Sequence, residues 1–460
     1  MGIVLHGGKV ITASNSIDAD VRIDGEVVSH IGKGIIRTGD EVIDVSGCLI
    51  LPGGIDAHTH FDLDVGFTVT SDNFETGTKA AIRGGTTTII NYATQYKGET
   101  LKQAFENEYS KAKNCYCDFG IHMGITDWNE NIATEMQDMV DLGATSFKLY
   151  MAYKNNLQVD DGVIYQVLKR SKEIGGLVTF HCENGDVIDA LIKEAVNEGH
   201  TSPKHHALTR PDILEREAIA RVIDIAGLLE VPIYVVHLST LMGLDVIRMF
   251  RNLGRKIYVE TCPQYLLLNE SLYEHEGEKY VMSPPLRKKS DNQALWSGLV
   301  DDFIDTIATD HCSFNYHGQK DLGKDDFRKI PNGAPGVEDR FALIYTYGVL
   351  QRRLTLNQFV AKISTNPAKI FGLYPKKGTI AVGSDADLVV LDPNYQTKIS
   401  AKTQLQNVDY NPYEGMVRKG FFRYVFLRGR RMVENENVVG HPCGQYIHRN
   451  TFSLGGEIYV

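Results

Sequence analysis

The chain has 460 residues, of which 43% are hydrophobic and 23% are charged, the balance of an ordinary globular protein with room for one large domain and an accessory lobe. Its formal net charge of -10, without a basic stripe interleaved with aromatic residues, argues against a nucleic-acid partner. No apolar run approaches the ~20 residues of a membrane span and no signal-peptide pattern opens the chain, so we expect a cytoplasmic protein.

The two ends of the chain are predicted to form one β-rich lobe. Short alternating runs within residues 1–50 are separated by Gly, Asp and Ser, which is the pattern of a small antiparallel sheet. The same alternating pattern recurs in residues 378–392 and 422–440. We expect residues 1–52 and 376–440 to pair into a β-sandwich lobe, and residues 441–460 to form a C-terminal tail that packs on a neighbouring subunit or frays.

The middle of the chain, residues 53–375, predicts a (β/α)8 barrel, the TIM-barrel fold. Eight apolar runs without clean alternation recur there, as suits parallel strands, with helical stretches between them. The runs are GGIDAHTH, TTTIINYA, DFGIHMGIT, SFKLYMA, LVTFHCE, IYVVHLS, KIYVETCP and DTIATDHC. In the first intervening stretch, Asp72 is the expected N-cap of a helix that Gly84 ends. A doubly wound open sheet is the alternative, but no G-x-G-x-x-G turn follows the first strand.

Polar residues mark the ends of these strands. They are His58 and His60 in the first strand, Lys148 in the fourth, His181 in the fifth, His237 in the sixth and Asp310 in the eighth. In a barrel all these ends lie on the face that carries catalysis. A single histidine ending an apolar strand is more often a hydrogen-bonded core residue. Four histidines and an aspartate favour a metal site, because core packing would have to explain each buried polar group separately.

Lys148 lies inside the apolar stretch TSFKLYMAYK, residues 145–154. One interpretation is a long stem that runs through the core and places its amine at the barrel mouth, beside an acid. The strand period of two puts Phe147 and Leu149 on the opposite side from Lys148, so Lys148 faces the barrel interior if the apolar side faces the helices. Burial there leaves a neutral amine, which can capture carbon dioxide as a carbamate and bridge two metal ions.

The remaining histidines and the cysteines carry weaker signals. His205 and His206 lie in a polar insertion, and His311 points to the opposite side from Asp310, so we expect these three at the surface or behind the metal-binding residues. His122 lies within a strand, and its role stays open. The seven cysteines form no C-x-x-C pair, which predicts reduced thiols rather than disulfides or a thiolate zinc site.

Several ordered motifs resemble the hydantoinase/dihydropyrimidinase family of cyclic amidohydrolases, most closely the bacterial D-hydantoinases. They are GGIDAHTHFD, FKLYMAYK, HCENGD, VVHLS, ETCPQYL, SPPLR, TDHC and PNGAPGVE, and the match runs from about residue 3 to about residue 440. The resemblance implies two divalent ions, zinc by expectation, in a TIM barrel beside a β-sandwich lobe. It assigns His58, His60 and Asp310 to one ion, His181 and His237 to the other, and N6-carboxylated Lys148 to the bridge between them.

The resemblance also implies substrate contacts. It assigns Tyr153 to the substrate carbonyl, and backbone groups of Ser283 and Asn332 to the cyclic imide. From the residues alone, Ser283 and Asn332 are ordinary turn residues beside a proline and a glycine, and Tyr153 is equally well a rim tyrosine. In the implied mechanism a hydroxide held by both ions attacks the ring carbonyl, Asp310 carries its proton to the ring nitrogen, and an N-carbamoyl amino acid is released.

Substrate choice within the family rests on a few positions. Dihydroorotases have an arginine where this chain has Asp62, so dihydroorotate is a poor candidate. Apolar residues in two loops would suit hydrophobic 5-substituents, or simply pack; they are Leu63, Val65, Phe67, Tyr150 and Leu157. After the second strand this chain has NYATQYKG, where similar family members more commonly have the sequence DFC. This difference leaves the substituent preference open.

Two alternatives to this function are retained. An allantoinase-like cyclic amidohydrolase would share the metal site. A metal-free assembly protein of the same fold, like the collapsin response mediator proteins, is disfavoured because every ligand position is occupied. The family resemblance further implies a small-molecule cyclic amide substrate and assembly as a homotetramer or homodimer.

Overall fold

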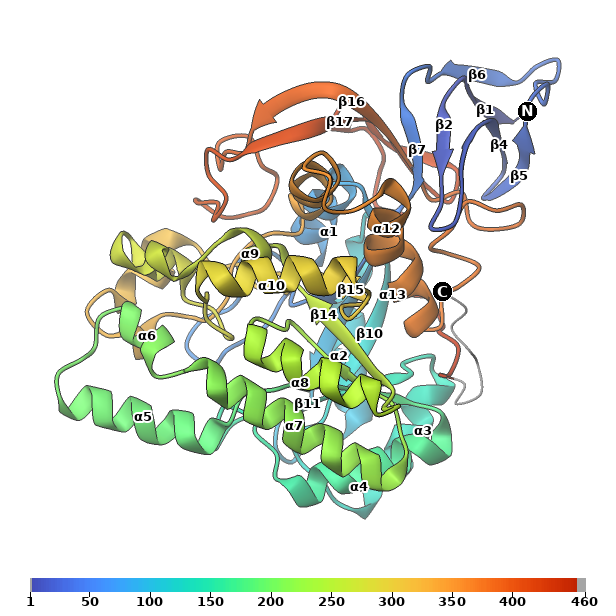
Figure 1. Ribbon diagram of the computed structural model, residues 1–460. Coiled ribbons are helices and arrows are strands. Elements are labelled where there is room, and N and C mark those ends of the chain that lie inside the picture. Colours follow the sequence, from blue (N-terminus) through green and yellow to red (C-terminus); the bar gives the residue numbers. More distant parts are fainter. Residues whose placement is uncertain (1, 453–460) are drawn as a thin grey trace.

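The computed structural model describes residues 2–452, and at its centre is a parallel eight-stranded barrel (Figure 1). The strands pair in chain order: β8 (Gly54–Thr59), β9 (Thr86–Thr94), β10 (Asp118–Gly124), β11 (Ser146–Tyr150), β12 (Leu177–His181), β13 (Ile233–Val235), β14 (Ile257–Thr261) and β15 (Thr306–Ile307). A bridge between Thr59 of β8 and His311, just beyond β15, joins the first and last strands. The predicted TIM barrel is therefore confirmed.

Helices cover the outside of the barrel. They are α1 (Phe74–Arg83), α2 (Leu101–Lys111), α3 (Glu130–Asp141), α4 (Asp161–Ile174), α5 (Gly185–Asn197), α6 (Lys204–Leu208), α7 (Asp212–Leu229), α8 (Leu241–Asn252), α9 (Pro263–Leu267), α10 (Lys289–Val300), α11 (Arg340–Ile344), α12 (Leu356–Val360) and α13 (Asn366–Ile370). Helix α1 ends at Gly84 as predicted, but its N-cap is Asn73, whose side chain accepts from the Thr76 amide. The prediction of Asp72 as this cap was wrong by one residue.

Strand β11 shows how the alternation of a strand separates core from site. Phe147 and Leu149 are fully buried and belong to the hydrophobic core shared with the helices. Lys148 and Tyr150 lie on the other side of the strand and line a cavity inside the barrel mouth. The orientation expected for Lys148 from the strand period is therefore confirmed.

The two chain ends build a lobe of two sheets beside the barrel (Figure 1). A four-stranded sheet contains β1 (Ile3–His6), β4 (Asp20–Asp24), β5 (Val27–Gly32) and β6 (Glu41–Asp44). A seven-stranded sheet joins β2 (Lys9–Ile11), β3 (Ser16–Asp18) and β7 (Leu49–Pro52) to β16 (Leu388–Lys398), β17 (Val417–Leu427), β18 (Arg430–Glu434) and β19 (Asn437–Val438). We predicted an antiparallel sheet for residues 1–50. This is wrong for two strand pairs, because β1 pairs with β6, and β2 with β7, in parallel.

Residues 441–452 pack under the amino ends of the barrel strands of their own chain. The Phe119 amide donates to the Gln445 carbonyl at 2.9 Å, and the Ile447 amide returns to the Phe119 carbonyl at 2.8 Å. Farther along, the Phe452 amide donates to the Gly175 carbonyl at 2.8 Å. The rest of the predicted tail, residues 453–460, lies outside the described residues.

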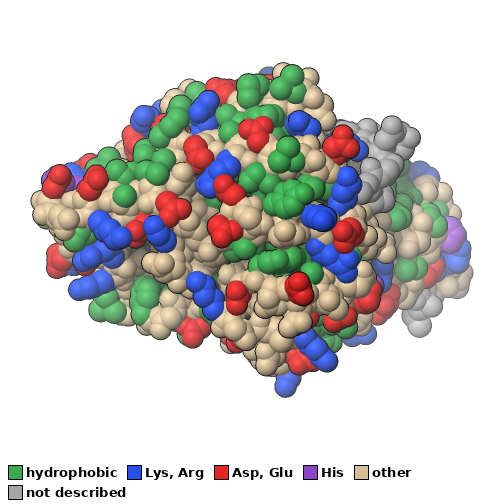
Figure 2. All heavy atoms as spheres, turned by 90° about the horizontal axis from the view of Figure 1, so that it is seen from below, with side chains coloured by type: hydrophobic (Ala, Val, Ile, Leu, Met, Phe, Trp, Pro, Cys, Tyr) green, Lys and Arg blue, Asp and Glu red, His purple; other side chains and the backbone are tan. Residues whose placement is uncertain are grey.

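The outer surface over α4, α5 and α7 carries charges of both signs. Figure 2 shows Lys and Arg side chains interspersed with Asp and Glu on the face seen from below, with hydrophobic side chains between them. Within residues 2–452, no helix is long and apolar enough to cross a membrane.

Candidate active site

A cavity of about 490 Å³ opens where the barrel strands end. All nine residues predicted to bind metal or substrate line it: His58, His60, Lys148, Tyr153, His181, His237, Ser283, Asp310 and Asn332. The five apolar residues proposed for the substituent also line it: Leu63, Val65, Phe67, Tyr150 and Leu157. The structure thus brings together residues that the sequence separates by more than 270 positions.

His58, His60 and Asp310 form a tight cluster. The Nε2 atoms of both imidazoles lie 3.0 and 3.2 Å from Asp310 Oδ1, and 3.2 Å from each other. Burial lowers the pKa of His58, but the charges of Asp310 and Glu260 outweigh burial and raise the pKa to about 9. The cluster therefore favours an added positive charge among its three ligand atoms.

His181 and His237 form a second group beside the first. Their ring centroids are 4.6 Å apart, and His237 stacks on His58 at 5.5 Å. His181 Nε2 lies 2.8 Å from Glu183 Oε2, which leaves its Nδ1 for the cavity. Burial lowers the pKa of both imidazoles, so both are held neutral, the form that binds a metal ion.

Lys148 lies between the two groups and is 1% exposed. Its Nζ lies over the rings of Tyr92 and Tyr150, 4.9 and 5.4 Å from their centroids, and no carboxylate of residues 2–452 is within ion-pair distance. Burial lowers the pKa of Lys148 to about 8 against the opposing charges of Asp310 and Glu260. The alternative prediction, a lysine whose amine pairs with an acid at the mouth, is therefore wrong.

The donor set fits a divalent metal ion. Four imidazoles and a carboxylate are the ligands that zinc accepts, and His58, His60 and Asp310 present three ligand atoms within 4.8 Å of one another. The Nδ1 atoms of His60 and His237 are buried without a hydrogen-bond partner in the described chain. A buried polar nitrogen without a partner is costly, and a bound metal ion would supply such a partner.

Backbone strain gathers around the cavity. Tyr153, His237 and Asp310 have φ angles of 68°, 39° and 53°, in the left-handed region that disfavours residues with a Cβ. Such residues cost about 1–3 kcal/mol each and cluster at active sites. The strained backbone directs these three side chains into the cavity.

The three predicted substrate contacts surround the cavity opening. Burial raises the pKa of Tyr153, so its hydroxyl keeps the proton that a donor to a carbonyl needs. The Ser283 hydroxyl lies 3.5 Å from Asn332 Oδ1, which places the two predicted imide-binding residues side by side.

Comparisons with known proteins identify the family. Residues 49–432 match the model of the amidohydrolase family. The chain is 47% identical over 452 residues to a D-hydantoinase of Geobacillus stearothermophilus, covering 97% of this chain and 96% of that protein. It is 43% identical over 458 residues to a D-hydantoinase of Streptomyces coelicolor, covering 97% and 98%. The crystal structure of a dihydropyrimidinase from Brevibacillus agri superimposes with a TM-score of 0.97 at 47% identity, covering 98% of this chain and 100% of that one.

The chain belongs to the amidohydrolase family. The resemblance to hydantoinases and dihydropyrimidinases that the sequence motifs indicated is thereby confirmed. This amidohydrolase also contains polar residues at its site that the sequence analysis missed.

Glu260, on β14, is the clearest of these missed residues. Its Oε1 lies 2.7 Å from His58 Nδ1 and accepts the His237 amide at 3.1 Å, while its Oε2 accepts the Tyr234 hydroxyl at 2.9 Å. One buried carboxylate therefore orients a histidine from each predicted metal group. A charged residue inside an apolar strand, the signal that identified Lys148, was also present at Glu260.

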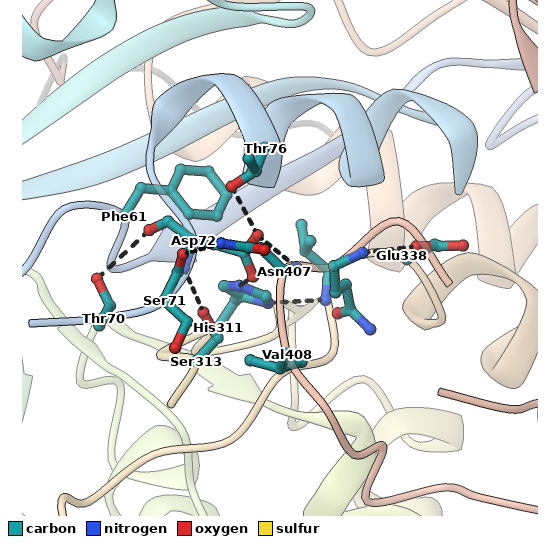
Figure 3. A network of polar contacts seen from close by, with 12 residues as sticks. Phe61, Thr70, Ser71, Asp72, Thr76, His311, Ser313, Glu338, Asn407 and Val408 are labelled. Carbon is teal, nitrogen blue, oxygen red and sulfur yellow. Dashed lines mark hydrogen bonds and ion pairs between the residues drawn. The ribbon is translucent and has the colours of Figure 1, made fainter. Parts of the chain in front are cut away.

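His311 and Asp72 form a buried pair that the sequence analysis did not connect (Figure 3). Two backbone amides donate to His311 Nδ1, so its Nε2 carries the proton and donates to Asp72 Oδ2 at 3.0 Å. Asp72 Oδ1 accepts from the Thr76 hydroxyl and the Asn407 amide at 2.8 and 2.9 Å. The pair is fully buried and ties the loop after β15 to three other segments of the amidohydrolase.

The structure also places the other residues that the sequence analysis discussed. Of the two positions expected for His206, the surface one is wrong: the side chain is buried, with Nε2 2.8 Å from the Met282 carbonyl and 3.5 Å from the Ser283 hydroxyl. His122 is buried in the barrel, where it stacks on Tyr92 at 4.6 Å. The Asp62 carboxylate turns toward α1 and accepts the Phe74 amide at 3.0 Å, whereas Asp64 lines the cavity. The prediction that Asp62 repels a substrate carboxylate is therefore wrong, and Asp64 is the carboxylate of this loop that lines the cavity.

Proposed function

We propose that this amidohydrolase hydrolyses the cyclic imide of 5-substituted hydantoins and dihydropyrimidines to N-carbamoyl amino acids, with two bound metal ions. The observation that carries the proposal is the convergence of all nine predicted residues on one cavity at the carboxyl end of the barrel. Relatives with 43–47% identity over nearly the whole chain bear the name D-hydantoinase.

The metal-binding residues are proposed as follows. His58, His60 and Asp310 would hold one divalent ion, zinc by expectation, and His181 and His237 would hold the other. Lys148, carboxylated on Nζ, would contribute a ligand to both. Such a pair of ions would lower the pKa of water toward ~7 and polarise a carbonyl oxygen.

The remaining chemistry belongs to the chain's own side chains. The Tyr153 hydroxyl donates to the carbonyl oxygen of the imide, where negative charge develops during attack by water. The Asp310 carboxylate takes a proton from the attacking water and returns it to the departing ring nitrogen. Backbone groups at Ser283 and Asn332 hold the ring, so that its scissile carbonyl faces Tyr153.

The apolar loop residues are proposed to receive the 5-substituent. Phe67 is 63% exposed although it lines the cavity, a position suited to a movable wall over a hydrophobic group. Asp64, on the same loop, disfavours substituents that carry a carboxylate.

Steady-state kinetics on three rings test the proposal. We expect kcat/KM for dihydrouracil and 5-phenylhydantoin to exceed that for allantoin, because the apolar lining of the cavity favours a phenyl group and disfavours the polar ureido group of allantoin. A strong preference for allantoin contradicts the proposed substrate class. A protein that turns over none of the three, even after incubation with zinc and bicarbonate, contradicts the enzymatic function itself.

A further inference from the structure

Two chain segments form one wall of the cavity, and they are far apart in sequence. The first contains Ser283 and the second contains Asn332, and both residues line the cavity. The Gly333 amide donates to the Val281 carbonyl at 3.1 Å, and the Ser283 hydroxyl lies 3.5 Å from Asn332 Oδ1. The second of these contacts is long for a hydrogen bond between oxygen atoms, so the segments are held directly by one good bond and one weak one.

Lys320 supplies a further connection. It ends the turn Tyr316–Lys320 and is 0% exposed, yet it does not line the cavity. Its Nζ donates to the Val281 carbonyl at 2.9 Å and to the Pro331 carbonyl at 3.0 Å. One acceptor is two residues before Ser283, and the other immediately precedes Asn332.

No ion pair accounts for the burial of Lys320. The titratable groups facing it are the Cys312 thiol and the His206 imidazole. Among residues 2–452 no carboxylate lies within ion-pair distance of its Nζ, and burial lowers the pKa of Lys320 to about 7. A lysine without an acid is almost never fully buried, because the cost of removing the amine from water is not offset by a counter-charge.

We propose that Lys320 is a positioning residue that holds the segments of Ser283 and Asn332 at the separation the substrate ring requires. The inference rests on the proposed function, because that function gives these two residues their contacts with the imide. Lys320 touches neither the ring nor the predicted metal-binding residues. Its effect is therefore on binding of the ring, in the ground state and the transition state alike, and so on KM rather than kcat.

The kinetic test compares two buried lysines. Lys320→Met removes both donated hydrogen bonds with little change in shape, and we expect KM for dihydrouracil to rise about tenfold while kcat changes less than about threefold. Lys362→Met is the matched control. Lys362 is 1% exposed and its Nζ donates to Asp302 and to the Ile304 carbonyl at 2.6 and 2.7 Å, away from the cavity, so its variant should lose thermal stability with KM unchanged.

A second readout does not require turnover. In Lys320→Met, hydrogen exchange of peptides spanning residues 281–284 and 330–333 should accelerate, while the same peptides of Lys362→Met exchange at the wild-type rate. Lys320→Gln keeps two N–H donors on a shorter side chain and should fall between wild type and Lys320→Met in KM and in exchange. It also replaces Lys320→Met in both measurements if that variant does not fold.

The outcomes separate the two proposals. An unchanged KM in Lys320→Met, a fall in kcat alone, or an equal rise in KM in Lys362→Met overturns the positioning role. If wild type hydrolyses no cyclic imide, the proposed function fails, and the exchange data alone decide whether Lys320 holds the two segments together.

Discussion

The two ends of the barrel each bring three side chains of the metal-binding type together, but only at the amino end does a lysine pair with all three. At the amino end, Lys377 Nζ lies 2.8, 3.0 and 2.6 Å from carboxylates of Asp118, Asp385 and Asp387. At the carboxyl end the cluster is His58, His60 and Asp310, and the nearby ammonium of Lys148 lies over aromatic rings instead. Convergent ligands thus leave a place for a metal ion only where no lysine of the chain already pairs with them.

Solvent access follows the same division. At the amino end, the Gln445 amide donates to Asp118 Oδ1 at 2.8 Å, and the Arg428 Nε lies 3.2 Å from Asp118 Oδ2. Residues 441–452 pack across this end, so its charges are paired and covered. The carboxyl end instead opens to the cavity of about 490 Å³. One end is built for stability and the other for chemistry, and substitutions should separate the two.

The largest expected effect is on catalysis at the carboxyl end. Asp310→Asn keeps the shape of the side chain but removes the proton acceptor, and kcat for dihydrouracil should fall by about 10³-fold or more. The variant also loses the ion pairs of Asp310 with His58 and His60, so the melting temperature is measured beside kcat and the kinetic loss is referred to the folded fraction. Turnover within tenfold of wild type would remove Asp310 from the chemistry.

The amino end should show the reverse pattern. Lys377→Met leaves three buried carboxylates without their main counter-charge, and the free energy of unfolding should fall by about 3–5 kcal/mol. Urea denaturation measures this loss. KM and the metal content of the folded fraction should remain those of wild type. Lys376→Met, at an exposed neighbour, is the control, and an equal loss in both variants would argue against the paired cluster.

A smaller effect is expected from the residue that orients the histidines. Glu260→Gln keeps an acceptor for His58 but loses the charge, and metal affinity should fall about 10–100-fold. Competition with a chelator measures this affinity. Glu183→Gln should weaken binding similarly through His181. If neither variant changes metal affinity, these carboxylates do not support the predicted ligands.

The smallest effect concerns Glu108, a buried carboxylate whose burial is only partly offset by the charge of Lys111. Burial raises the pKa of Glu108 from 4.5 to about 7, although Lys111 opposes this. Between pH 4.5 and pH 7 the folded protein keeps this proton while the unfolded chain releases it, so the free energy of unfolding falls as pH rises through this interval. Glu108→Gln should make that fall shallower, as measured by denaturation at several pH values; an unchanged slope would show that Glu108 is ionised throughout.

Much of the fold and the candidate site could be predicted from local sequence patterns. The parallel barrel follows from eight apolar runs, and strand ends then place the histidines, Lys148 and Asp310 on one face. The strands themselves proved shorter than expected. His237 lies two residues beyond β13 and Asp310 three beyond β15, in left-handed conformations that strand periodicity does not encode.

What the sequence did not reveal depends on contacts between distant segments. Asp72 has the sequence position of a helix cap, but its partner His311 is 239 residues away. The sequence around Lys320 is polar, which is typical of an exposed loop. Only the packing of two other segments around Lys320 shows that it is buried. Such pairings arise from tertiary structure, so no local period or cap pattern identifies them.

The central claim, that the carboxyl end of the barrel is a site for two metal ions bridged by Lys148, is tested most directly by metal analysis of the purified protein. Elemental analysis is carried out on wild type and on Lys148→Ala. The wild-type protein should contain about two divalent ions per folded chain. The variant should lose bound metal and activity together while remaining folded. A wild-type protein that hydrolyses hydantoins without metal, or a Lys148→Ala variant that keeps both ions, would contradict the account.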